Sequence, residues 1–200
     1  MVIAGTTLAS SSVLASLMGC SESTDPSTHA VLRVGTETGL LNFVYAVVQL
    51  ETDFYTRAVG NRFPGILTSE ATAFDDFSNE TYAERDALYD ALPTGRISDA
   101  VFFTLGQVVN FSNRASTVTA AQTIEDTAAR GFAAAATALQ TAGSSHAALV
   151  ADIATAAANR ANAVRAMASA GTLTITPLSP ADVMTTLAPY YLTTFTVTTA

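Results

Sequence analysis

Residues 42–60 read NFVYAVVQLETDFYTRAVG, and their apolar side chains recur at the spacing of one helix face. Thr36, a little upstream, is suited to cap the start of such a helix, and Gly60 is suited to end it. The apolar positions of residues 36–59 are Leu40, Phe43, Val44, Val47, Val48, Leu50, Phe54 and Tyr55. The stretch therefore predicts a long amphipathic helix, and Glu51 falls close to its apolar stripe.

Three later stretches have the same periodicity and predict helices over about residues 70–92, 116–139 and 145–168. The last two are rich in alanine, which favours a helix and allows neighbouring helices to approach closely. Residues 99–113 are mixed in character and predict a connector or a short helix. Four long helices with a long connection between the second and the third predict an all-α, antiparallel four-helix bundle.

The C-terminal part begins with Ser179-Pro180, a pair that favours the start of a helix. We expect a short helix over residues 179–191, followed by a β-like or irregular tail over residues 192–200. The predicted organisation is thus one domain over residues 36–191 and this tail. A signal-like segment and a polar linker precede the domain, over residues 1–19 and 20–35.

The N-terminal segment, residues 1–19, is apolar and uncharged, and Leu17-Met18-Gly19 stands immediately before Cys20. It resembles a bacterial lipoprotein signal peptide, which implies cleavage before Cys20 and a lipid on its thiol. The resemblance implies a location in the cell envelope, periplasmic or membrane-anchored through Cys20. No arginine or lysine precedes the apolar run, so an ordinary N-terminal helix with a buried free cysteine is the alternative.

The composition argues against several classes of function. Charged residues make up 13% of the chain, the formal net charge is -8, and every cationic side chain other than histidine is an arginine. Such an acidic chain lacks the basic patch that nucleic acid binding requires. A single cysteine excludes an internal disulfide and a cysteine-based zinc site.

Four segments together resemble the ferritin-like domain family that includes the desiccation-associated proteins. They are NFVYAVVQLETDFYTRAVG, ERDALYDAL, NFSNRASTVTAAQTIEDTAARGFAAAA and SPADVMTTLAPYYL, in that order along the chain. The resemblance covers about residues 36–191 and implies a ferritin-like four-helix bundle. In metal-binding members of this fold, two helices supply one Glu each and two supply a Glu-x-x-His pair, which together hold two metal ions.

Most of those ligand positions hold other residues in this chain. Carried over residue by residue, the positions hold Val48 on the first helix, Thr81 and Glu84 on the second, Glu125 on the third, and Ala157 and Arg160 on the fourth. The two histidines do not replace the missing ligands, because His29 precedes the domain and His146 stands at the expected start of the fourth helix. The resemblance therefore predicts a bundle without a metal cofactor and without a catalytic residue.

Three charged residues, Glu51, Glu125 and Arg160, fall on or near apolar helix faces. An unpaired buried charge is very costly, so we predict that Arg160 lies where metal would bind and pairs with Glu125, Glu51 or Glu84. The alternative is that these long side chains lie at helix edges and reach solvent.

The sequence favours a non-catalytic structural or interaction role at the cell envelope, with a protein partner or self-association. One alternative is a divergent carboxylate-bridged iron or manganese protein, an oxidase or an iron-handling protein, with Glu51, Glu84 and Glu125 as ligands. Another is an assembly subunit whose tail, residues 192–200, adds a strand to a neighbour.

Overall fold

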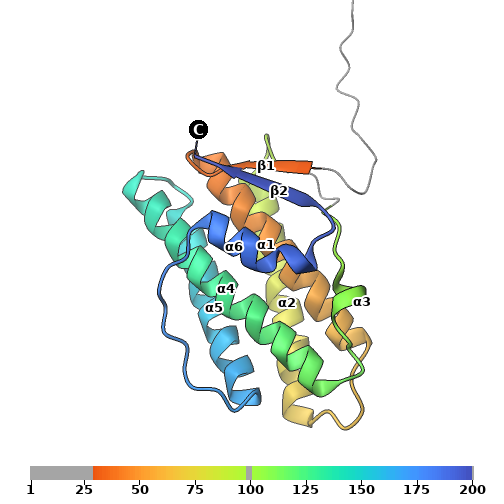
Figure 1. The fold of residues 1–200 in the computed structure, drawn as a ribbon. Helices are drawn as coiled ribbons and strands as arrows, with labels where there is room; N and C mark the ends of the chain where they lie inside the picture. Colours follow the sequence, from red (N-terminus) through yellow and green to blue (C-terminus); the bar gives the residue numbers. More distant parts are fainter. Residues whose placement is uncertain (1–28, 98–100, 200) are drawn as a thin grey trace, which may run out of the picture.

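The computed structural model describes residues 29–97 and 101–199. Four long helices form the body of the molecule: α1 (Glu37–Gly60), α2 (Thr68–Ala91), α4 (Arg114–Thr141) and α5 (Ala147–Met167) (Figure 1). The hairpin of α1 and α2 packs against the hairpin of α4 and α5, mainly through α1 and α4. The predicted all-α bundle is confirmed, and each long helix begins and ends within two residues of the predicted bounds.

Side-chain caps explain where two of these helices begin. The hydroxyl oxygen of Thr36 accepts a hydrogen bond from the backbone N–H of Gly39 (3.0 Å), and Asn113 accepts one from the N–H of Ser116 (3.0 Å). Each bond satisfies an N–H group that has no partner within its own helix. The predicted cap at Thr36 is thus present.

The connection from α2 to α4 contains a short helix, α3 (Leu105–Val108). Asn42, on the buried side of α1, ties the start of this connection to the bundle. Its amide nitrogen donates to the carbonyl of Gly95 (2.8 Å), and its amide oxygen accepts from the N–H of Ile97 (2.8 Å). A single side chain of the first helix thereby fixes a segment more than fifty residues away.

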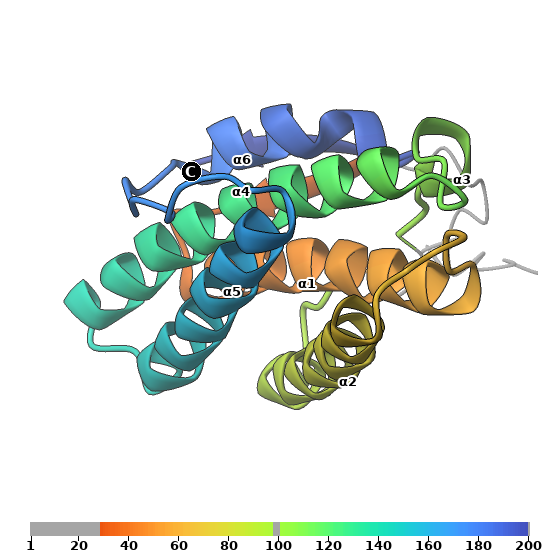
Figure 2. The same ribbon diagram turned by 90° about the horizontal axis from the view of Figure 1, so that it is seen from below.

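The C-terminal segment closes the bundle on the outer side of α4, where α6 (Pro180–Leu187) and a 3-10 turn, η1 (Ala188–Tyr190), lie (Figures 1 and 2). A Cβ atom on Gly131 would lie 2.6 Å from the side chain of Val183, so glycine is required for this close approach. After η1, the hydroxyl group of Tyr191 donates to the carbonyl of Ala46 in α1 (2.9 Å). The predicted short last helix is present and is docked on both hairpins.

Two strands, β1 (His29–Arg33) and β2 (Thr194–Thr198), pair in parallel with His29 opposite Thr194. The β-like character expected of the tail is borne out, but β1 was not predicted, because residues 20–35 were assigned to a linker. A strand of this kind forms only when its partner from the far end of the chain arrives, so its local sequence gives a weak signal. The tail pairs here with its own chain.

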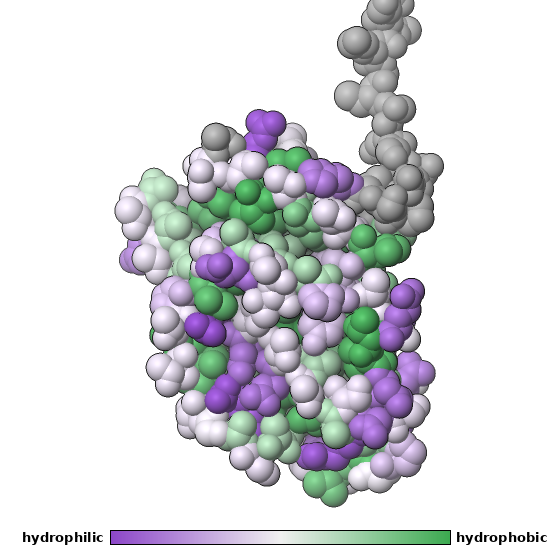
Figure 3. All heavy atoms as spheres, in the orientation of Figure 1, coloured by the Kyte–Doolittle hydropathy of each residue, from purple (hydrophilic) through white to green (hydrophobic). Residues whose placement is uncertain are grey.

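Among the helices of the described residues, none is both long and apolar enough to cross a membrane. Hydrophilic and hydrophobic residues are interspersed on the face seen in Figure 3. The predicted signal-like segment and Cys20 lie outside the described residues.

Candidate functional site

Three glutamates and one arginine meet at the centre of the bundle, one from each long helix. Glu51 comes from α1, Glu84 from α2, Glu125 from α4 and Arg160 from α5. We call these four residues the Arg160 cluster. They are the residues that the sequence proposed for the core ion pair, and the structure brings all of them together.

Arg160 makes hydrogen bonds to all three carboxylates. Its two terminal nitrogens donate to the two oxygens of Glu84, at 2.7 and 3.1 Å, in a bidentate pair. Its Nε lies 3.2 and 3.3 Å from the two oxygens of Glu125, and Nη2 lies 3.3 Å from Oε1 of Glu51. The planar guanidinium group can serve several carboxylates at once because its donors point outward in fixed directions.

The cluster is largely shielded from solvent. The side chains of Glu51 and Glu125 are fully buried, Arg160 is 1% exposed, and Glu84 is 11% exposed. Charges buried this deeply are tolerated only when they are paired, and here the guanidinium supplies the pairing. Glu84 is the member that lies nearest to solvent.

Burial and mutual repulsion shift the pKa values of the carboxyl groups upward. Burial raises the pKa of Glu51 well above its ordinary value, and the charge of Glu125 raises it further. Burial also raises the pKa values of Glu84 and Glu125, against the opposing effect of Arg160. Three carboxyl groups share one guanidinium, and Glu51, whose Oε2 has no hydrogen-bond partner among the described residues, is best placed to keep a proton.

Arg160 itself stays charged. Burial alone would lower its pKa, but the attraction of Glu125, Glu51 and Glu84 raises it well above its ordinary value. The cluster therefore holds a permanent cation at its centre throughout the range in which proteins are stable.

Small or apolar side chains occupy the neighbouring positions at which the resemblance implies ligands. Val48, Thr81 and Ala157 are each fully buried, one turn before Glu51, Glu84 and Arg160 respectively. The hydroxyl group of Thr81 donates to the carbonyl of Ser78 (3.1 Å), within its own helix. None of the three offers a carboxylate or an imidazole to the cluster.

The described residues do not fit a two-metal centre. Such a centre needs several carboxylates and imidazoles free to coordinate, whereas each carboxylate here already accepts a hydrogen bond from Arg160. A metal cation would also be repelled by the guanidinium at the distances above. In the part of the chain that the structure describes, no group of three or more His, Cys, Asp or Glu side chains is arranged to hold a metal ion.

The two histidines lie at other places in the molecule, and neither is hydrogen-bonded to the cluster. His29 in β1 is hydrogen-bonded to Thr196 of β2 (2.6 Å). His146 precedes α5, and its Nδ1 lies 2.8 Å from a carboxylate oxygen of Glu37 at the start of α1. His146 stands at the start of α5, as expected, but its side chain makes no capping hydrogen bond to the helix.

Two residues near the cluster were not assigned to it from the sequence. An oxygen of Glu80, which is half exposed, lies 3.6 Å from Nη1 of Arg160. Its position one turn before Glu84 on the same helix face was the available signal. Tyr55 was interpreted as packing only, yet burial and the nearby charge of Glu125 raise the pKa of its hydroxyl group well above the ordinary value.

The arrangement can therefore hold four helices in register through one charged centre. Comparison with curated proteins returned no match. A model of the ferritin-like domain family matches residues 36–170, which include all four long helices and every member of the Arg160 cluster. On this match and on the observed bundle, the chain belongs to the ferritin-like domain family.

Proposed function

We propose that this protein is a non-catalytic member of the ferritin-like domain family, with a structural or interaction role in the cell envelope. The observation that carries the proposal is the contact of Arg160 with Glu51, Glu84 and Glu125. In metal-binding members, cations balance the carboxylates of the bundle centre. Here the guanidinium of Arg160, a cation that belongs to the chain itself, balances the carboxylates. The bundle therefore needs no metal to be assembled.

The chemistry of the cluster supports a structural role. A guanidinium neither changes oxidation state nor binds oxygen, and it is not deprotonated in proteins. Glu51 and Glu125 are fully buried, so a substrate has no access to them, and the partly exposed Glu84 is engaged by Arg160. What remains is a specific charged contact that selects one arrangement of the four helices, a use for which buried polar groups are known.

Metal analysis of the purified full-length chain tests the proposal. We expect iron and manganese well below one equivalent, both as isolated and after incubation with Fe(II) or Mn(II), and no ferrous oxidation above the buffer rate. Stoichiometric iron or manganese would contradict the proposal. It would favour the alternative of a divergent carboxylate-bridged metal protein with Glu51, Glu84 and Glu125 as ligands.

Arg160→His is the matched variant for this experiment. It removes the fixed cation and places an imidazole one turn after Ala157, at a position where the family pattern has histidine. We expect this variant to take up more Fe(II) or Mn(II) than the natural chain. Equal uptake by both proteins would show that the guanidinium does not exclude metal.

The envelope location rests on the lipoprotein-like sequence around Cys20. We expect the protein expressed in a bacterial host to be cleaved before Cys20, to carry lipid and to fractionate with membranes. The Cys20→Ser variant should lose the lipid mass and leave the membrane fraction. A natural chain that keeps Met1–Gly19 and carries no lipid would contradict this part of the proposal.

An interaction role through the tail is a second candidate, favoured by the β1–β2 ribbon, which has only two strands among the described residues and to which a neighbour could add another. Deletion of residues 192–200 should then change the oligomeric state measured by light scattering. An unchanged oligomeric state in a variant that remains helical would argue against assembly through the tail.

A further inference from the structure

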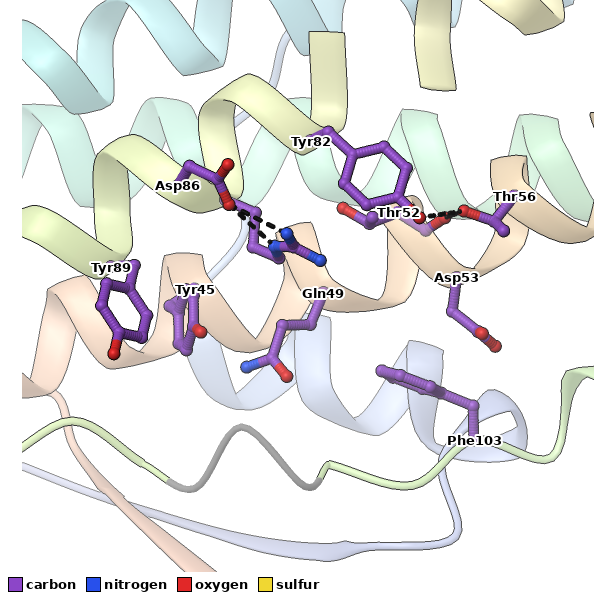
Figure 4. Close-up of a pocket in the computed structure, with 10 residues that line it drawn as sticks. Tyr45, Gln49, Thr52, Asp53, Thr56, Tyr82, Asp86, Tyr89 and Phe103 are labelled. Atoms are coloured by element: carbon purple, nitrogen blue, oxygen red, sulfur yellow. Dashed lines mark hydrogen bonds and ion pairs between the residues drawn. The ribbon is translucent and has the colours of Figure 1, made fainter. Parts of the chain in front are cut away.

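A cavity of about 510 Å³ lies on the outer side of α1 and α2, at the α2–α4 connection (Figure 4). Its volume is in the range typical of small-molecule sites. The lining carries four aromatic rings, namely Tyr45, Tyr82, Tyr89 and Phe103. The cavity is separate from the Arg160 cluster, since none of its lining residues belongs to that cluster.

The charged groups at the cavity neutralise one another. Asp53 forms an ion pair with Arg57 (2.7 Å), and Asp86 forms one with Arg85 (2.9 Å). With Asp53 paired to Arg57, beside the cavity, and Asp86 paired to Arg85, these charges balance one another among the described residues. A strongly anionic or cationic ligand would have to break one of these pairs, so the cavity suits an uncharged molecule.

Two of the aromatic rings at the cavity, those of Tyr82 and Tyr89, remain partly accessible to solvent. Tyr82 is 39% exposed and Tyr89 is 45% exposed. Arginine side chains lie over both rings, with Arg85 4.8 Å from the centre of the Tyr82 ring and Arg96 3.5 Å from that of Tyr89. These cation–π contacts hold the rings in place and already use positions that a cationic ligand would need.

Gln49 adds an unsatisfied polar group. Its side chain points from α1 into the space between Tyr45 and Phe103 (Figure 4). The residue is only 7% exposed, and its amide nitrogen has no hydrogen-bond partner among the described residues. A buried donor without a partner is uncommon and costs free energy, so a ligand oxygen that accepts this bond would be favoured.

We propose that this cavity binds a neutral, hydroxyl-rich ring compound, that is, a carbohydrate of one or two sugar units. Sugar rings have C–H faces that pack on aromatic rings, and their hydroxyl rims match an amide, carboxylates and hydroxyl groups. Besides the free amide of Gln49, the hydroxyl groups of Thr56 and Tyr82 lie at the cavity, 3.0 Å from each other. This binding activity goes beyond the structural role proposed above and does not depend on the Arg160 cluster.

The experiment titrates the full-length chain with D-glucose, N-acetylglucosamine and maltose. The chain contains no tryptophan, so its fluorescence comes from tyrosine, and the tyrosines at the cavity make that signal a direct readout. We expect saturable binding of at least one probe with a dissociation constant of about 1 mM or below, corresponding to about -4 kcal/mol. Calorimetry provides a second measurement without an optical signal.

The variants assign the binding to the cavity. Tyr89→Ala and Gln49→Ala should each weaken the binding about tenfold, while Gln140→Ala, at the exposed end of α4, should leave it unchanged. Circular dichroism checks that each variant is folded. If Tyr89→Ala does not fold, Tyr82→Phe replaces it as the second cavity variant.

Three results would overturn the proposal. The first is no saturable binding of any of the three sugars. The second is binding that folded cavity variants do not weaken. The third is saturable binding of tetramethylammonium, a cationic probe, that is tighter than the binding of any of the three sugars, because the cavity would then recognise charge through its aromatic rings.

Discussion

The two sides of α1 hold their buried polar groups in different ways. On the inner side, Glu51 is fully buried, and its Oε1 accepts a hydrogen bond from Arg160, although its Oε2 has no partner among the described residues. On the outer side, two residues earlier, Gln49 is also nearly buried, but its amide nitrogen has no partner among the described residues. The inner group is held by the protein itself, which suits a structural role. The outer group is left free beside a cavity, which suits a role in binding.

The largest expected effect is the loss of the central cation. Arg160→Ala should lower the free energy of unfolding by about 3–5 kcal/mol, because three buried carboxylates lose their shared partner. Arg85→Ala, on the outer side, is the control and should change it by no more than about 1 kcal/mol, because its pair with Asp86 and its contact with the Tyr82 ring both lie at exposed residues. Chemical denaturation measures both values, and similar losses for the two variants would remove the contrast between the two sides.

A smaller loss is expected when one carboxylate of the cluster is neutralised. Glu84→Gln weakens the bidentate pair with Arg160 and should lower the free energy of unfolding by about 1.5–3 kcal/mol. Asp86→Asn, on the exposed face of the same helix, should have almost no effect. A stabilising Glu84→Gln substitution would mean that repulsion among the carboxylates outweighs their pairing.

The pH dependence of stability should show the shifted pKa of Glu51. Its folded-state pKa is raised, so the folded chain keeps a proton that the unfolded chain releases above the ordinary value of 4.5. The free energy of unfolding therefore falls as the pH rises from that value through the folded-state pKa. Glu51→Gln should flatten this decline in denaturation experiments over that pH range. An unchanged slope would show that Glu51 is ionised in the folded protein.

Glu70 is a control for the pH experiment, because its pKa is shifted in the opposite direction to that of Glu51. A hydrogen bond from Arg114 lowers its pKa, so its contribution to stability is present above the ordinary value and is lost as the pH falls through the folded-state pKa. Glu70→Gln should therefore weaken the acid dependence and leave the decline above pH 4.5 in place.

The smallest effect is expected at Gln49. Gln49→Met removes the unpaired amide and keeps a side chain of similar length, so the free energy of unfolding should rise by up to about 1 kcal/mol. The same variant should lose carbohydrate affinity if the cavity binds sugars. A clear loss of stability would show that the amide has a structural partner, and the distinction between the two sides of α1 would weaken.

Much of the inner side could be predicted from the sequence, because its signals are periodic. The apolar spacing of residues 42–60 predicts the helix and directs Glu51 inward, and the same reasoning places Glu125 and Arg160 on apolar faces. Pairing then follows from the cost of an isolated buried charge. Glu80 was missed because a half-exposed glutamate on a polar face looks like an ordinary surface residue.

The cavity and β1 could not be predicted, for a common physical reason. The cavity depends on where Phe103 lies relative to α1 and α2, and β1 depends on a partner more than 160 residues later in the chain. Neither dependence leaves a local pattern in the sequence. Contacts that join distant segments are fixed by the assembled fold, whereas periodicity reports only on the element that carries it.

The parallel pairing of β1 and β2 has a mechanical consequence. A force that pulls the chain at the N-terminal end of β1 and at the C-terminal end of β2 slides the two strands past each other along their length. The hydrogen bonds of the ribbon then share the load together, instead of opening one after another from an end. When such a force is applied, the β1–β2 ribbon would therefore resist the tension before any helix of the bundle unfolds.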